Sequence, residues 1–237
     1  MNVKSLIIYL FIFLFYSIHS SAQSDRNVIS SKFKIQKTTK GKKVVIEADI
    51  YYMLDKREIL IHYTYPDEYI FMSNELGEAK VYYPKKNEVS LLQNDLFSAE
   101  TDILYMFFTQ NMTEMGLKKL GYNLLESKMD GKFLVTRWSS PSSVNNIAEV
   151  ELVFDDYLPV YTSYTSTDNK KLNKVYYSNY QDVKGYYVPL RTTEILYLAK
   201  GDSIVSRKDY FDIKVGSQVR IDYINYQIPD NAKVIKK

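Results

Sequence analysis

The chain has 237 residues, a formal net charge of +3 and no cysteine. The lack of cysteine excludes disulfides, thiolate metal sites and a cysteine nucleophile, so a hydrophobic core must hold the fold together. Lysines are interspersed with acidic residues instead of forming a concentrated basic face, which argues against nucleic acid as a partner.

The N-terminus has the three parts of a secretory signal peptide. Lys4 precedes an unbroken apolar run over residues 6–16, and small residues end the segment. The run is shorter than the roughly 20 residues that a membrane-spanning helix needs. We therefore expect cleavage near Ala22 or Gln23 and a periplasmic mature protein. The alternative is a retained N-terminal anchor.

Most of the remaining chain alternates apolar and polar residues with a period of two, which is typical of half-buried strands. In residues 45–53 the apolar side carries Ile46, Ala48, Ile50 and Tyr52. Further strands are predicted at 57–65, 68–74, 79–84, 87–92, 122–128, 132–138, 147–154, 160–166, 172–179, 186–199, 203–214 and 218–227. Short turns rich in Gly, Asn, Asp and Pro separate them, which predicts an antiparallel meander.

One region interrupts the alternation, from Ser98 to about Gly121. Ser98 can cap a helix, and apolar residues then recur at helical spacing. A second short helix is predicted from about Thr113, with Gly121 as its stop. The sequence therefore predicts a helical insertion at about 98–121 inside a large antiparallel sheet.

These elements define the expected fold class, mainly β (α+β). A sheet with one apolar face must cover that face, and the insertion is too small to cover it all. We expect a strongly curved antiparallel sheet or half-open β-barrel with a short helical lid and an apolar cavity. Residues 1–22 would be the signal peptide, and 23–237 would form a single domain.

The order of elements resembles the LolA-like family, the periplasmic outer-membrane lipoprotein carriers and lipoprotein-sorting relatives. The resemblance covers nearly the whole mature chain. It rests on the helical pair within 98–121 and on these segments in order: YPDEYIF, NELGEAKVYYPKKNEV, EVELVFDDYLPVYTSY, VYYSNYQDVKGYYVPLRTTEI and NYQIPDNAKVI. It implies a half-open barrel under a helical lid, with an inner face that accommodates acyl chains.

The sequence departs from the family pattern at two places. Lipoprotein carriers of this type commonly have an arginine after the first aromatic residue, whereas Tyr69 is followed here by Ile70. The family tends to begin with an amphipathic helix, whereas residues 27–39 alternate like a strand. Both departures concern the cargo more than the fold.

The residues that could carry catalysis are few. His62 is the one histidine beyond the predicted signal peptide, and it is expected mid-strand on the more polar face, with no metal site and no catalytic triad. Glu149 and Glu151 alternate with apolar residues and are expected to point to solvent rather than to form a glycosidase pair. No nucleotide-binding fingerprint occurs. We expect no cofactor and no enzymatic activity.

The leading hypothesis is a periplasmic carrier or binding protein for lipoprotein acyl chains or another apolar ligand. Its partners would be a lipidated protein or other acyl-chain ligand, with membrane-associated donor and acceptor proteins. The candidate cavity lining, inferred from alternation, is Ile59, Ile61, Tyr63, Tyr69, Phe71, Val81, Tyr83, Ile103, Phe107, Val150, Leu152 and Phe154. The alternatives are an envelope sensor or protein-interaction module of the same fold, and a secreted hydrolase.

Overall fold

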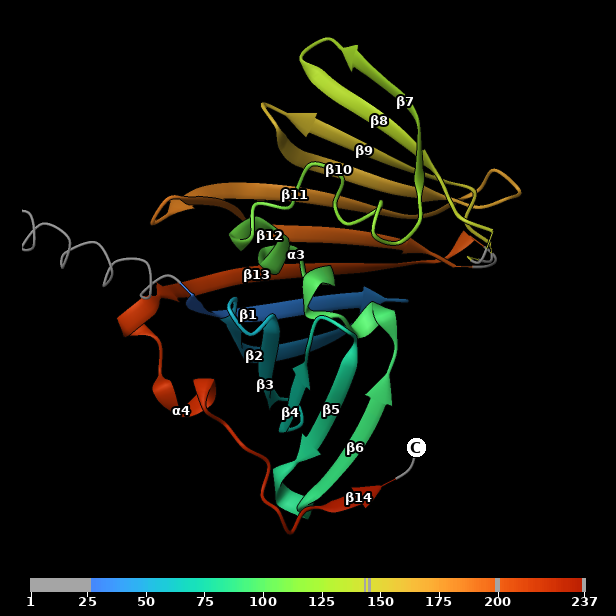
Figure 1. Cartoon of the computed structure of the whole chain (residues 1–237). Helices are drawn as coiled ribbons and strands as arrows, with labels where there is room; N and C mark the ends of the chain where they lie inside the picture. The colour runs from blue at the N-terminus through green and yellow to red at the C-terminus, as the bar shows by residue number, and fades with distance from the viewer. Residues whose placement is uncertain (1–26, 143, 145, 199–200, 236–237) are drawn as a thin grey trace, which may run out of the picture.

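The computed structural model describes residues 27–142, 144, 146–198 and 201–235. The predicted signal peptide and its cleavage site lie outside these residues. The 14 strands of these residues form one curved sheet, in the order β14-β6-β5-β4-β3-β2-β1-β13-β12-β11-β10-β9-β8-β7 (Figure 1). Because β14 and β7 stand at opposite ends, the sheet is open and not a closed barrel. The predicted fold class, a strongly curved antiparallel sheet with a LolA-like arrangement, is confirmed.

The sheet consists of two meanders joined by long central strands. The first contains β1 (Val28–Thr39), β2 (Lys42–Met53), β3 (Glu58–Tyr65), β4 (Tyr69–Ser73), β5 (Glu78–Tyr83) and β6 (Glu88–Gln93). The second contains β7 (Asn123–Asp130), β8 (Phe133–Ser139), β9 (Glu149–Asp155), β10 (Leu158–Thr165), β11 (Lys171–Val183), β12 (Tyr186–Tyr197) and β13 (Ser203–Val215). Antiparallel pairing of β1 with β13 joins the two.

The chain passes from β6 to β7 across the concave side of the sheet, because these strands lie far apart in the strand order. We call residues 94–122 the crossing segment. It contains short 3-10 turns at Asp95–Phe97 and Ala99–Thr101, then helix α3 (Ile103–Phe108). The helix lies in front of the concave face in Figure 1. The predicted helical insertion is therefore present. The second helix predicted from Thr113 is wrong, since hydrogen-bonded turns occupy residues 113–121.

The outer face of the first meander is also covered. After β13 the chain forms a 3-10 turn (Gly216–Gln218) and helix α4 (Ile221–Ile224), then runs to the short strand β14 (Lys233–Ile235), which pairs in parallel with β6. The strand predicted at 218–227 is therefore wrong. We call residues 216–235 the C-terminal strap. The strap packs on Tyr51, Leu60, Ile70 and Tyr82. Alternation predicted a more polar outer face because it cannot show that the strap returns to cover it.

Two further apolar clusters lie on the concave face. The larger one joins β1, β2, β3, β12 and β13 to α3, and its members Ile29, Ile50, Tyr52 and Leu104 are fully buried. The smaller one lies over β8 to β10, where the turns of the crossing segment cover the second meander. The crossing segment thus covers concave apolar surface on both meanders, which fixes its position by burial.

Candidate functional site

Strand register places the predicted lining residues of both meanders on the concave face. Residues that pair directly across antiparallel strands share a face, as do residues two apart on one strand. In the first meander the pairs Ile50–Ile61, Ile61–Phe71 and Phe71–Val81 follow one another. A continuous path to the second meander runs through Phe33–Tyr210, Lys208–Thr192, Thr192–Tyr177, Val175–Thr162 and Thr162–Leu152.

The predicted lining residues differ in how deeply they are packed. Six are buried: Ile59, Ile61, Phe107, Val150, Leu152 and Phe154. The other six are partly exposed: Tyr63, Tyr69, Phe71, Val81, Tyr83 and Ile103. The partly exposed strand residues lie together on β3, β4 and β5. This part of the concave face is where apolar side chains still meet solvent.

An aromatic row crosses the concave face from buried side chains on β13 and β1 to the partly exposed side chains on β3, β4 and β5. Ring centroids are 6.2 Å apart for Tyr210 and Phe33, and 6.0 Å apart for Phe33 and Tyr63. Tyr63 and Tyr69 stack at 4.2 Å, and Tyr83 lies 6.1 Å beyond Tyr69. Such spacings give favourable offset or edge-to-face contacts. The aromatic row (Tyr210, Phe33, Tyr63, Tyr69 and Tyr83) therefore forms one apolar strip across β13, β1, β3, β4 and β5.

Helix α3 packs directly into the concave face. Leu104 is fully buried, and Phe107 is 2% exposed. The Phe108 ring lies 5.4 Å from Tyr186 of β12, and the Phe107 ring lies 5.9 Å from Tyr180 of β11. The helix side chains thus occupy concave surface that the sequence suggested as ligand cavity. A ligand on that part of the face would displace α3, whereas the aromatic row lies beside it.

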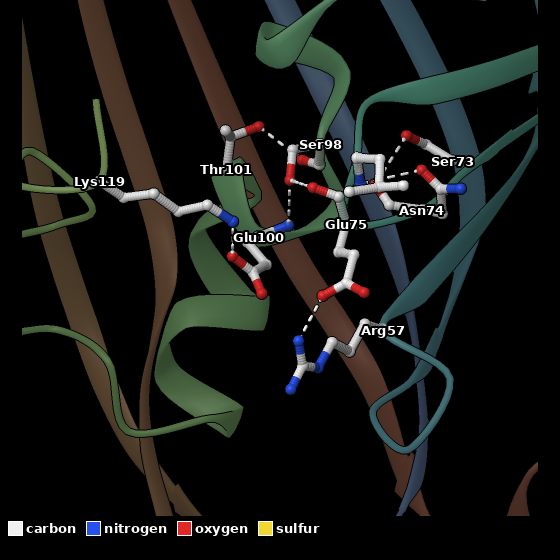
Figure 2. Close-up of polar contacts among 9 residues, drawn as sticks. Arg57, Ser73, Asn74, Glu75, Ser98, Glu100, Thr101 and Lys119 are labelled. Carbon is white, nitrogen blue, oxygen red and sulfur yellow. Dashed lines mark hydrogen bonds and ion pairs between the residues drawn. The ribbon is translucent and has the colours of Figure 1, made fainter. Parts of the chain in front are cut away.

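A polar network attaches the crossing segment to the turn between β4 and β5 (Figure 2). Ser98 Oγ donates to Glu75 O at 2.8 Å and accepts from the Glu100 amide at 3.3 Å. Arg57 of the β2–β3 turn pairs with Glu75, and Lys119 pairs with Glu100. These contacts link the β2–β3 turn and the β4–β5 turn to the crossing segment. They hold the start of the crossing segment at one end of the concave face.

A polar cluster lies beneath the start of α3. Asp102 Oδ1 caps the helix by accepting from the amides of Leu104 and Tyr105, and it also accepts a 2.9 Å hydrogen bond from Tyr52 Oη. Asp102 Oδ2 faces the Lys208 ammonium at 4.0 Å. The ammonium lies 4.1 Å from the Phe33 ring centroid and 4.6 Å from that of Tyr210, within cation–π range.

The electrostatics of this cluster reflect its burial. The Lys208 side chain is 21% exposed and Asp102 is 13% exposed. Burial lowers the pKa of Lys208, and the Asp102 carboxylate opposes that shift. Burial also raises the pKa of Tyr52 and of Tyr210 well above the ordinary value. Among the described residues, Tyr210 Oη is buried with no hydrogen-bond partner.

His62 lies on the outer face, as predicted, but it is not a solvent-facing strand residue. The C-terminal strap covers it, and its side chain is 14% exposed. Tyr223 Oη lies 3.0 Å from Nδ1, and Glu68 lies 3.3 Å from Nε2. His62 therefore joins the strap to β3 and stands on the opposite side of the sheet from the aromatic row.

The remaining titratable candidates, Glu149 and Glu151, lie beside Arg137. Glu149 lies on the outer face, where Arg137 is 3.8 Å away, and Glu151 shares that face, paired across from Arg137. Both are partly buried rather than fully solvated. Within the described ranges, no group of three or more His, Cys, Asp or Glu side chains is arranged to hold a metal ion.

Sequence reasoning missed Asp102 as the helix cap, and it missed Lys208 altogether. The signal for Lys208 was present: in the segment SRKDYFD it shares alternation parity with Tyr210, and so falls on an apolar face. A lysine at such a position is either at a solvated edge or paired. Only the register of β13 against β1 brings it onto Phe33.

Neither a known protein-family profile nor a curated protein sequence matches this chain. Solved structures do match. A LolA superfamily protein from Nitrosomonas europaea aligns with 88% of this chain and 96% of its own, at TM-score 0.56 and 15% identity. A DUF1329 family protein from Desulfovibrio piger aligns with 86% and 92%, at TM-score 0.59 and 14% identity.

A third structure is described as an outer membrane lipoprotein-sorting protein domain, from Vibrio parahaemolyticus. It aligns with 83% of this chain and 89% of its own, at TM-score 0.58 and 10% identity. In the part of the chain that the structure describes, no helix has the length and apolar character to span a membrane. At these identities the similarity concerns architecture, and this chain has a LolA-like fold.

Proposed function

We propose that this protein is an exported carrier or binding protein for the acyl chain of a lipidated protein, or for another apolar ligand, and that it works in the periplasm. The aromatic row on the concave face, whose members Tyr63, Tyr69 and Tyr83 are partly exposed, is the observation that supports this most directly. It offers a continuous strip of ring faces and edges beside a short helix that could move aside.

The energetics of such a site come from burial. Each methylene removed from water contributes about 0.8 kcal/mol, so a chain of moderate length can offset the cost of immobilisation. The same burial holds α3 on the neighbouring surface through Leu104 and Phe107. A ligand longer than the aromatic row would therefore compete with α3, and release would follow when α3 packs back. Membrane-associated donor and acceptor proteins would shift that competition.

The test is ligand capture by the mature chain. Native mass spectrometry of protein expressed in bacteria should show bound lipid, and the uncharged probe N-phenyl-1-naphthylamine should bind with saturable fluorescence. Val81→Glu places a charge on the partly exposed concave face and should weaken probe binding about tenfold. Leu91→Glu is the matched control, because Leu91 of β6 is 58% exposed on the outer face.

Circular dichroism should show both variants folded. If the wild-type chain carries no lipid and binds no probe, the carrier proposal fails. If Val81→Glu and Leu91→Glu weaken probe binding equally, a ligand site on the concave face is excluded.

A further inference from the structure

The inner end of the aromatic row bears a buried positive charge. Lys208 stands on β13 beside Tyr210, the first member of the row, and its ammonium lies over the rings of Phe33 and Tyr210. A desolvated ammonium is costly unless it is paired and hydrogen-bonded. Its partner Asp102 is 4.0 Å away, which is longer than an N–H···O hydrogen bond. The charge is therefore incompletely satisfied.

A second, independent observation lies next to it. The Tyr210 hydroxyl is buried, and the residue is 3% exposed, yet no protein group described in the structure accepts from it or donates to it. A buried hydroxyl without a partner costs free energy, and water or a ligand atom normally satisfies it. An ammonium and an unpartnered hydroxyl at neighbouring same-face positions of β13 both favour an oxygen anion.

We propose that Lys208 and Tyr210 form the head-group subsite of the concave face, and that it takes the carboxylate of a fatty acid whose chain lies along the aromatic row. This deepens the proposed function and rests on it. The Asp102 carboxylate faces this subsite from the start of α3. An incoming carboxylate would replace Asp102 as counter-ion to Lys208, and Tyr210 Oη would donate to it.

The geometry also predicts which ligands are rejected. An alkylammonium would place a second cation beside Lys208, and a neutral alcohol would leave the ammonium paired only with Asp102. Selectivity for an anionic head over a neutral one should therefore reside in Lys208. Affinity for the chain should reside in the aromatic row. Acetate, which has no chain to bury, should bind too weakly to compete.

The experiment measures displacement of N-phenyl-1-naphthylamine at pH 7.5 by laurate, dodecanol, dodecylammonium and acetate. Laurate should compete about tenfold better than dodecanol, dodecylammonium should be weakest of the three, and acetate should not displace the probe. Lys208→Met should weaken the binding of laurate about tenfold and leave the binding of dodecanol unchanged. Lys208→Arg, which keeps the charge, should restore most of the preference for laurate.

Two further variants complete the design. Lys34→Met is the matched control, because Lys34 lies on the outer face of β1 in an ion pair with Glu47. This variant should change the binding of neither laurate nor dodecanol. Asp102→Asn keeps a capping side chain but removes the competing charge, so laurate should bind more tightly.

The outcomes separate the two proposals. If no amphiphile displaces the probe, both the carrier function and the subsite are overturned. If laurate and dodecanol compete equally in the wild-type chain, or if Lys208→Met weakens both to the same extent, only the carboxylate subsite is overturned. If acetate displaced the probe at the same concentration as laurate, the site would bind free anions, and the fatty-acid subsite would also be overturned.

Discussion

Tyr52 of β2 and Asp102 at the start of α3 are joined by a 2.9 Å hydrogen bond from the phenol to Oδ1. Tyr52 is fully buried, so this bond connects the floor of the concave face to the residue that caps the helix. The same carboxylate faces Lys208. Asp102 therefore couples helix capping, packing of α3 and the charge state of the concave face.

Removing the Tyr52 hydroxyl should loosen α3 without opening a cavity. Tyr52→Phe is expected to lower the free energy of unfolding by about 1.5–3 kcal/mol, because the lost bond is to a charged group and Asp102 remains buried. Urea unfolding measures this, and amide exchange should rise in residues 103–108. Tyr157→Phe is the control, since Tyr157 is 88% exposed. Equal effects from the two variants would contradict this account.

The turn between β4 and β5 requires glycine at position 77. Gly77 has φ +73°, and a Cβ there would lie 2.2 Å from Asn94 O at the start of the crossing segment. Gly77→Ala should therefore cost more than about 2 kcal/mol, from backbone strain plus displacement of that segment. Gly41 has nearly the same φ, +75°, but a Cβ there would meet open space. Gly41→Ala should therefore lower the free energy of unfolding only by the backbone strain, about 1 kcal/mol. Equal midpoints in urea would contradict the contact with Asn94.

Ser98 should matter more than the ion pairs around it. Its hydroxyl both donates to Glu75 O and accepts from the Glu100 amide (Figure 2). Ser98→Ala should lower the free energy of unfolding by about 1–2 kcal/mol. Glu100→Gln removes only the pair with Lys119, whose side chain is 60% exposed, and should cost less than about 1 kcal/mol. A larger loss in Glu100→Gln than in Ser98→Ala, by urea titration, would reverse this ranking.

Alkaline pH should destabilise the fold through its buried tyrosines. Burial raises the pKa of Tyr164 and of Tyr51 to about 12, whereas an unfolded tyrosine titrates near pH 10. Between these values the unfolded chain releases phenolic protons that the folded chain keeps, so stability falls as pH rises from about 10 to about 12. Lys208 acts in the opposite direction, because its lowered pKa makes its own contribution grow with pH up to its unfolded value near 10.4.

Urea unfolding at pH 9, 10 and 11, with tyrosinate absorbance at 295 nm as a second probe, measures the alkaline effect. Tyr164→Phe should reduce the fall in the free energy of unfolding as pH rises, and Tyr157→Phe should leave that fall unchanged. If all tyrosines titrated near pH 10 while circular dichroism stayed native, burial would not control their ionisation.

Alternation alone predicted most strands and the concave face, because a period of two reports which side of a strand meets apolar surroundings. Ile59, Ile61 and Phe71 were placed on one face in this way, and the register agrees. The segment 218–227 was misassigned because Tyr223 and its neighbours are apolar for a different reason, contact with the outer face. Local pattern does not distinguish a strand from a strap that packs on one.

The sequence by itself determined an antiparallel sheet, either strongly curved or a half-open barrel, with a helical insertion, since strand period, turn residues and capping are local properties of the chain. Only the tertiary structure decided how the concave face of that sheet is used. The pairing of β1 with β13 brings Lys208 onto Phe33, although the two residues are 175 positions apart in the sequence. The crossing segment then brings Asp102 opposite Lys208. Contacts of this separation depend on strand register and burial, which no short stretch of sequence contains.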